Sequence, residues 1–330
     1  IISAQCDVEY KAAEDEKNDT LKFKMYSRLL ECYYKTDDFD GGGKVISKLE
    51  ALMSVLVKKY KDSTYYRFYL GEITSFYFYK GDMVKCLEAS NTLLNYNYRR
   101  SDLSQIAGSL GNIAILYRKS GNYPKAIHYL QESIKLNSKI GKKDLAGNYS
   151  NLANVYSDIN QPDKAKEYFI KALRLRLEQN DEKGIALSYA NLGNYYSNNE
   201  QFDSAIYYYS KAIFLNEKQH APDSKKALTL NNYTGLFIQQ NKLDSAIKYL
   251  KLTEKLLNEK SNPFMLAHFY ENRGDISKRQ HKFKEAIVDY NLSIKLSVQN
   301  KDINRLAGLY LSKSRSFYGL RDIDSTVANK

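Results

Sequence analysis

The chain has 330 residues, of which 43% are hydrophobic, and it carries 50 basic and 38 acidic side chains. Its apolar runs are only a few residues long, far short of the roughly 20 residues that cross a bilayer, so no membrane insertion is expected. The net charge of +12 favours acidic partners in general. The basic residues are scattered singly over the predicted helix faces, which argues against a nucleic-acid partner.

Residues 1–20 are predicted to be a separate N-terminal segment. Residues 1–5, Ile-Ile-Ser-Ala-Gln, could be the remnant of a secretory signal with small residues near a cleavage point, and the rest begin the first helix. This segment slightly favours an extracytoplasmic or periplasmic location, and the cytoplasm remains the alternative. The three cysteines, Cys6, Cys32 and Cys86, have no metal-binding or redox spacing, so we expect buried, unreactive thiols.

Residues 21–330 contain an internal repeat with a period of about 40 residues. Its first part has Asn followed by aliphatic and small residues and then Tyr or Phe, as in Tyr149–Tyr156 and Tyr189–Tyr196. Its second part has a small residue before an apolar one, at successive spacings of 44, 40, 39, 40, 41, 40 and 40. The residues in this small-residue position are Gly42, Cys86, Ala126, Ala165, Ala205, Ala246, Ala286 and Thr326. These spacings predict eight units, the last one truncated within a helix pair.

Each unit is predicted to be a pair of amphipathic helices. Tyr149, Leu152, Ala153 and Tyr156 have the i, i+3, i+4, i+7 spacing of one buried helix face, and a similar stripe follows Ala165. The four prolines fall at helix boundaries, and no alternating strand pattern is present, so we expect almost no sheet. Most of the 30 tyrosines lie on the packing stripes and are assigned to the core.

The repeat resembles the tetratricopeptide repeat. The fifth unit fills the consensus positions of that family most completely, with Tyr189, Leu192, Gly193, Tyr196, Ala205, Tyr209 and Ala212. Arg273 in a Leu position and Gly42 in an Ala position depart from the consensus and leave the packing of those units open. The resemblance implies an all-α, right-handed superhelical solenoid of stacked antiparallel helix pairs over residues 21–330.

The long period is similar to that of kinesin light chains, Rap-type bacterial peptide receptors and the repeat arrays of bacterial signalling proteins. In such arrays the first helices of the pairs line a concave groove. Five asparagines hold one position in successive units, namely Asn112, Asn151, Asn191, Asn232 and Asn272. A second row lies one turn further on, at Asn154, Asn194 and Asp275.

A row of carboxamides can pair with the backbone of an extended peptide, because each offers a donor and an acceptor. The alternative is that Asn is only the structural consensus at this position. No His-Glu-x-x-His or Cys-x-x-Cys motif is present, and Gly41-Gly42-Gly43-Lys44 lacks the upstream glycine and the hydroxyl residue of a phosphate loop. We therefore predict no catalytic residue, metal or cofactor.

The predicted function is a non-catalytic scaffold that binds a protein or an extended peptide, as the sensing or interaction module of a larger bacterial signalling or regulatory protein. A peptide-gated allosteric regulator is the alternative. An RNA-binding solenoid is the third possibility, and it is disfavoured because no continuous basic stripe is visible. The oligomeric state is left open, and we expect the native chain to continue beyond residue 330.

Overall fold

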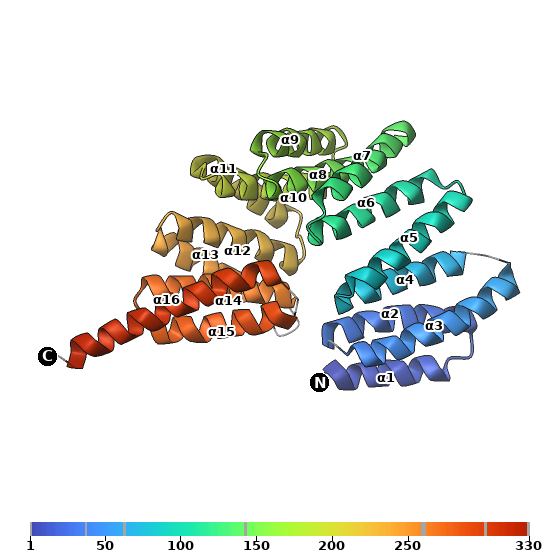
Figure 1. The fold of residues 1–330 in the computed structure, drawn as a ribbon, viewed down its shortest axis with the longest axis horizontal. Helices are drawn as coiled ribbons and strands as arrows, with labels where there is room; N and C mark the ends of the chain where they lie inside the picture. The colour runs from blue at the N-terminus through green and yellow to red at the C-terminus, as the bar shows by residue number, and fades with distance from the viewer. Residues whose placement is uncertain are drawn as a thin grey trace. The chain divides into compact units, whose positions relative to one another are not determined.

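The computed structural model describes residues 2–36, 38–61, 64–141, 144–258, 262–299 and 302–328. Within these residues every regular element is an α-helix, as the all-α prediction requires. The chain divides into two compact units, Ile1–Gln161 and Pro162–Lys330. Figure 1 shows the helices of both units.

The described part of the first unit contains eight helices, and each helix packs on the next along the chain. They are α1 (Ile2–Asp15), α2 (Asp19–Thr36), α3 (Phe39–Tyr60), α4 (Thr64–Lys80), α5 (Met83–Arg99), α6 (Leu103–Lys119), α7 (Tyr123–Ile140) and α8 (Leu145–Asp158). The predicted pairs correspond to α2 with α3, α4 with α5, and α6 with α7. The glycines at 41–43 lie inside α3, which begins after its N-cap, Asp38.

The second unit continues the same alternation of helices. Its members are α9 (Pro162–Glu178), α10 (Glu182–Asn198), α11 (Phe202–Lys218), α12 (Asp223–Gln239), α13 (Leu243–Leu256), α14 (Pro263–Arg279), α15 (Phe283–Gln299) and α16 (Ile303–Ala328). The pairs α10 with α11, α12 with α13, and α14 with α15 pack closely, and α16 lies beside both α14 and α15 (Figure 1).

Helix boundaries follow from the capping residues that the sequence provides. The side chains of Asp82, Asp102 and Asn122 each accept a hydrogen bond from the backbone N–H three residues on, at the start of α5, α6 and α7. Pro162 and Pro263 are the first residues of α9 and α14, where a proline costs no hydrogen bond.

The predicted small-residue positions lie in the core. Cys86, Ala126, Ala205, Ala246 and Ala286 are all fully buried. Buried small side chains allow two helices to approach closely while larger side chains fill the space around them. The packing role that the repeat assigned to this position is therefore confirmed for these residues.

Buried polar contacts link one helix pair to the next within each unit. In the first unit, Asn97 near the end of α5 donates to Ser109 Oγ of α6 at 3.0 Å. In the second, Arg176 of α9 donates to Ser188 Oγ at 2.7 Å and to the carbonyl oxygen of Gly184 at 3.0 Å. Arg176 is buried, and desolvation lowers its pKa, so these two contacts satisfy an arginine that the sequence analysis did not single out.

The prediction of three free thiols is wrong for two of them. Cys6 of α1 and Cys32 of α2 form a disulfide, with their Cα atoms 5.8 Å apart, and Cys86 is a buried free thiol as expected. The two partners are separated by 26 residues, which matches no local motif. They meet because α1 and α2 pack against each other, and Cys6 and Ala13 of α1 are buried in the same core cluster as Leu29 of α2.

The prediction of an eighth pair with Thr326 in its second helix is also wrong, because α16 runs without a break from Ile303 to Ala328. The side chain of Thr326 lies outside the described residues. The preceding turns recur once per repeat and place Asn160, Glu200, Asn241 and His281 at positive φ. One repeat after His281, the residue at this turn position is Arg321, which lies within α16. The αL conformation favours Gly and Asn, so this position carries no strong signal for a turn.

Candidate peptide-binding face

The five asparagines of the predicted row lie on the first helices of the pairs, namely α6, α8, α10, α12 and α14, but they are not equivalent. Asn112 is exposed, Asn151, Asn191 and Asn232 are half-buried, and Asn272 is buried at 4% exposure. The row therefore passes from an open surface in the first unit to the interior near the end of the second.

In the first unit, the row consists of Asn112 on α6 and Asn151 on α8. The two helices are in contact, and neither carboxamide has a hydrogen-bond partner within the described part of the chain. Asn154, one turn after Asn151, is half-buried and likewise has no recorded partner there. An ion pair fixes the ends of these helices, since Arg118 Nε lies 2.6 Å from Asp158 Oδ2.

Two glycines lie one turn before these asparagines, Gly108 in α6 and Gly147 in α8. A Cβ atom added at either position would meet no atom within 4 Å, so neither glycine is required for packing. A glycine inside a helix costs about 1 kcal/mol relative to alanine. Their effect is to leave the helix backbone of α6 and α8 uncovered beside Asn112 and Asn151.

In the second unit, the second predicted row serves packing. Tyr209 of α11 donates its hydroxyl hydrogen to Asn194 Oδ1 at 2.5 Å, and Asn232 Nδ2 donates to the same oxygen at 3.0 Å. Asp275 accepts from the hydroxyl of Tyr290 at 2.7 Å and from Lys278 Nζ at 2.9 Å. Asn194, Asn232 and Asp275 are thus used within the protein.

Asn272 lies in the interior between α12 and α14. Its Nδ2 atom donates to both the backbone oxygen and Oδ1 of Asn231, at 2.9 and 2.7 Å. The Nδ2 atom of Asn231 is buried without a hydrogen-bond partner within the described structure. At this end of the row, a structural role for the asparagine therefore fits better than a ligand-binding role.

Glu72 on α4 is a polar residue of this face that the sequence analysis missed. It lies one repeat before Asn112, so extending the period backwards would have found it. Burial raises the pKa of its carboxyl to about 7, Glu31 nearby adds to the rise, and a hydrogen bond with Ser27 opposes it. Phe68, one turn earlier on α4, is 52% exposed.

A polar cluster joins α14 to α16 in the second unit. Arg305 pairs with Glu271 and with Asp302, the latter at 3.0 Å. Burial lowers the pKa of His268 to about 4, and the charge of Arg305 adds to that effect. Among the described residues, no group of three or more His, Cys, Asp and Glu side chains is placed to hold a metal ion. The cluster therefore connects α14 with α16.

Among the described residues, no helix is both long enough and apolar enough to cross a bilayer.

Comparison with known proteins agrees with this architecture. Models of the tetratricopeptide repeat match residues 105–178 and 186–219. A search of curated proteins found no match. Residues 105–178 and 186–219 therefore carry tetratricopeptide repeats, a fold typical of non-catalytic protein-interaction scaffolds.

Several solved structures share the fold at low sequence identity. A Rap protein complexed with Competence and Sporulation Factor is 13% identical, with a TM-score of 0.63 over 96% of this chain and 92% of that one. NprR in complex with its cognate peptide NprX is 16% identical, with a TM-score of 0.61 over 96% and 90%. A tetratricopeptide repeat protein from Parabacteroides merdae is 15% identical, with a TM-score of 0.55 over 88% and 98%.

Proposed function

We propose that this chain is a non-catalytic binding module that holds an extended peptide, or an extended segment of a partner protein, against the first helices of its pairs. The observation that carries the proposal is the open surface of α6 and α8. There Asn112 and Asn151 have no partner in the described structure, and Gly108 and Gly147 leave the adjacent backbone uncovered.

The chemistry of this surface suits a peptide backbone. A carboxamide both donates and accepts hydrogen bonds, so it can pair with an N–H and a C=O of the ligand whatever the ligand's side chains are. Glycine lets another chain approach a helix closely. Each such hydrogen bond contributes about 0.5 to 1.5 kcal/mol net, and ordering a flexible peptide opposes binding, so we expect micromolar affinity.

We assign ligand contacts to the asparagines of the first unit that have no partner within the described structure, Asn112, Asn151 and Asn154. Asn194, Asn232, Asn272 and Asp275 already have partners within the protein and are assigned to structural support.

The disulfide supports an extracytoplasmic location. Disulfides persist in oxidising compartments and are rare in the cytosol, and Cys6–Cys32 joins the two N-terminal helices. We infer that the module samples peptides or proteins outside the cytoplasm as part of a larger signalling or regulatory protein. A structure of a signal-transduction ATPase with a tetratricopeptide repeat sensor, from Pyrococcus horikoshii, is a precedent for such an arrangement. It covers 93% of this chain, which corresponds to 40% of that protein, at a TM-score of 0.51.

The second candidate is a peptide-gated regulator, in which the ligand changes the arrangement of the repeats. It is favoured by the two neighbours whose structures contain a signalling factor or cognate peptide and which match 96% of this chain. Small-angle scattering separates the two candidates. A change in the radius of gyration on peptide addition supports the regulator, and an unchanged radius at saturation supports the scaffold.

Binding itself is tested with a phage library of random linear peptides selected on the full chain, followed by fluorescence anisotropy with the selected sequences. The double variant Asn112→Ala, Asn151→Ala should bind at least about 10-fold more weakly, since two hydrogen-bonding groups are lost. Asn291→Ala, an exposed asparagine on α15, is the matched control. Equal affinity for the double variant and the control would rule out the proposed face.

A further inference from the structure

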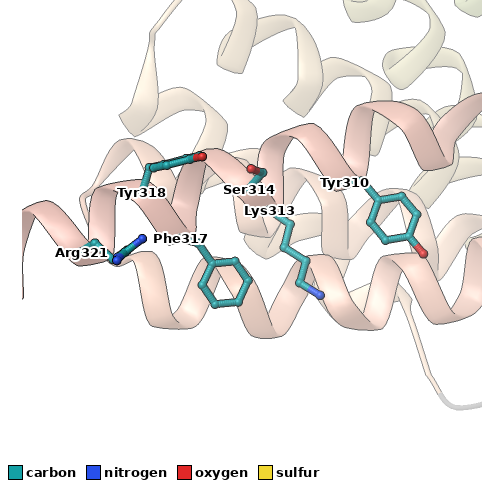
Figure 2. A pocket seen from close by; sticks show the side chains of 6 residues that line it. All are labelled: Tyr310, Lys313, Ser314, Phe317, Tyr318 and Arg321. Atoms are coloured by element: carbon teal, nitrogen blue, oxygen red, sulfur yellow. The ribbon is translucent and has the colours of Figure 1, made fainter.

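One face of α16, here called the α16 stripe, is uncovered. Tyr310, Lys313, Ser314, Phe317, Tyr318 and Arg321 line a shallow pocket of about 390 Å³ along it. Figure 2 shows the rings of Tyr310 and Phe317 on the same side of the helix as the Lys313 ammonium group. The positions 310, 313, 314, 317 and 321 have the spacing of one helix face, which in a soluble protein normally packs against another element.

The repeat shows which surface of a first helix the α16 stripe corresponds to. Tyr310, Lys313, Ser314 and Phe317 occupy the repeat positions that Tyr189, Leu192, Gly193 and Tyr196 hold in α10, three repeats earlier. In α10, Tyr189 and Tyr196 lie against the ring of Tyr208, and Gly193 lies against the ring of Tyr209; both tyrosines belong to the second helix, α11. Tyr196 is 7% exposed and Phe317 is 47% exposed. The α16 stripe therefore has the residues of a first helix, and within the described part of the chain no second helix covers it.

The preceding helix pair, α14 with α15, shows which kind of side chain would pair with Lys313. One repeat earlier, the same position holds Arg273 of α14, whose Nη2 and Nε atoms lie 2.6 and 3.0 Å from Asp289 carboxylate oxygens on α15. Asp289 is buried at 5% exposure. A cation at this position of the first helix is thus paired with an acidic residue of the second helix. That residue, Asp289, follows the small residue Ala286 by three positions.

The charge of α16 extends this argument. The part of α16 that carries the stripe, residues 303–321, contains Arg305, Lys313, Arg315 and Arg321 and no acidic residue, and Asp322 and Asp324 follow it in the sequence. Arg305 is already paired with Glu271 and Asp302, whereas Lys313 and Arg321 line the pocket. A second copy of α16 on this stripe would bring basic side chains together, so a complementary surface must be acidic.

We propose that the α16 stripe docks an amphipathic helix of a partner protein, and that this helix presents a small residue followed three positions later by an Asp or Glu that pairs with Lys313. The residue after the acid faces Ser314. At the equivalent place Tyr290 lies over Gly274, where a Cβ would come within 2.9 Å of its ring. Because Ser314 has a Cβ, the partner helix carries Leu or Phe there, as Leu130 and Phe169 do in earlier repeats.

The probe for this site is a synthetic peptide of residues 283–299 with Tyr290→Leu, held helical by a hydrocarbon staple between positions 291 and 295, which are exposed in α15. Fluorescence anisotropy with the full chain should give saturable micromolar binding. Lys313→Glu should weaken it at least about 10-fold, and the same peptide with Asp289→Lys should restore binding to that variant. Arg315→Glu has the same charge change at an exposed α16 residue outside the pocket and should leave binding within about 2-fold of wild type.

Several outcomes would overturn the proposal. The first two are absence of binding to the wild-type chain and binding that Lys313→Glu does not change. A third is sedimentation showing a dimer that Lys313→Glu dissociates, which would identify a second copy of the chain as the occupant. This test is independent of the peptide-binding face, because Asn112→Ala, Asn151→Ala should bind the stapled helix as the wild type does.

Discussion

Tyr209 donates a hydrogen bond to Asn194 across the interface between α11 and α10, while its ring lies over Gly193. The same arrangement recurs two repeats later, where Tyr290 bonds to Asp275 and its ring lies over Gly274. In both pairs a glycine makes room for the ring, and the next residue binds the hydroxyl. Asn194 and Asp275 therefore hold a buried tyrosine in place.

The first prediction concerns two glycines with opposite surroundings. Gly193→Ala should destabilise the protein by about 1 to 3 kcal/mol, because its Cβ would lie 2.7 Å from the Tyr209 ring. Gly108→Ala is the matched control, since nothing lies within 4 Å of its added Cβ. It should stabilise the helix by up to about 1 kcal/mol. Urea unfolding of both variants measures the difference, and equal effects would contradict the packing described here.

The second prediction separates the two ends of the asparagine row. Asn272→Ala should cost about 1 to 3 kcal/mol, because it leaves the buried Oδ1 atom of Asn231 without its donor. Asn112→Ala should change stability by less than about 0.5 kcal/mol, since the side chain is exposed. Thermal or urea unfolding checks both values. A stable Asn272→Ala variant would show that this asparagine is not a structural link.

The third prediction concerns the disulfide. Reduction should lower stability by roughly 3.5 kcal/mol, the chain-entropy value for a loop of this length, because the bond closes a separation of 26 residues. Unfolding with and without dithiothreitol measures it. Thiol titration of the denatured, oxidised protein should find one free thiol, Cys86, and after reduction all three cysteines of the chain. Three free thiols before reduction would show that the bond does not form.

The fourth prediction concerns pH. Burial raises the pKa of Glu72 from 4.5 to about 7, so the folded state binds more protons than the unfolded state between these values. The contribution of Glu72 to stability is therefore fully present below about pH 4.5 and is lost as the pH rises to about 7. Glu72→Gln cannot ionise, so it should gain stability relative to the wild type across this range. A constant difference would contradict the raised pKa.

His268 provides the opposite control. Its pKa falls from 6.5 to about 4, so the folded state binds fewer protons than the unfolded state in this range. Its contribution is present above about pH 6.5 and is lost as the pH falls towards 4. The stability of His268→Gln relative to the wild type should therefore rise as the pH falls. Because the two residues lie in different units, the variants should show opposite trends independently.

The repeat made much of the fold predictable. Its near-constant period placed the helices, and the prolines and small residues marked their ends and their closest contacts. Such features are local, because each depends on a residue's own conformational preferences or on its position along one helix face. The place of Asn112 on the first helix of its pair followed from the same periodicity, and so would that of Glu72 had the row been extended.

Other features depended on contacts between helices that no period encodes. Asn112 and Asn272 occupy equivalent positions in the sequence, yet one is exposed and the other is buried against Asn231. Cys6 and Cys32 are paired because α1 packs on α2, and α16 continues past Arg321, where earlier repeats turn. By itself, the sequence determined that this protein is a series of paired helices and which face of each is apolar. The tertiary structure decided which polar groups are used inside the protein and which remain for a partner, since that depends on distances between residues far apart in the chain.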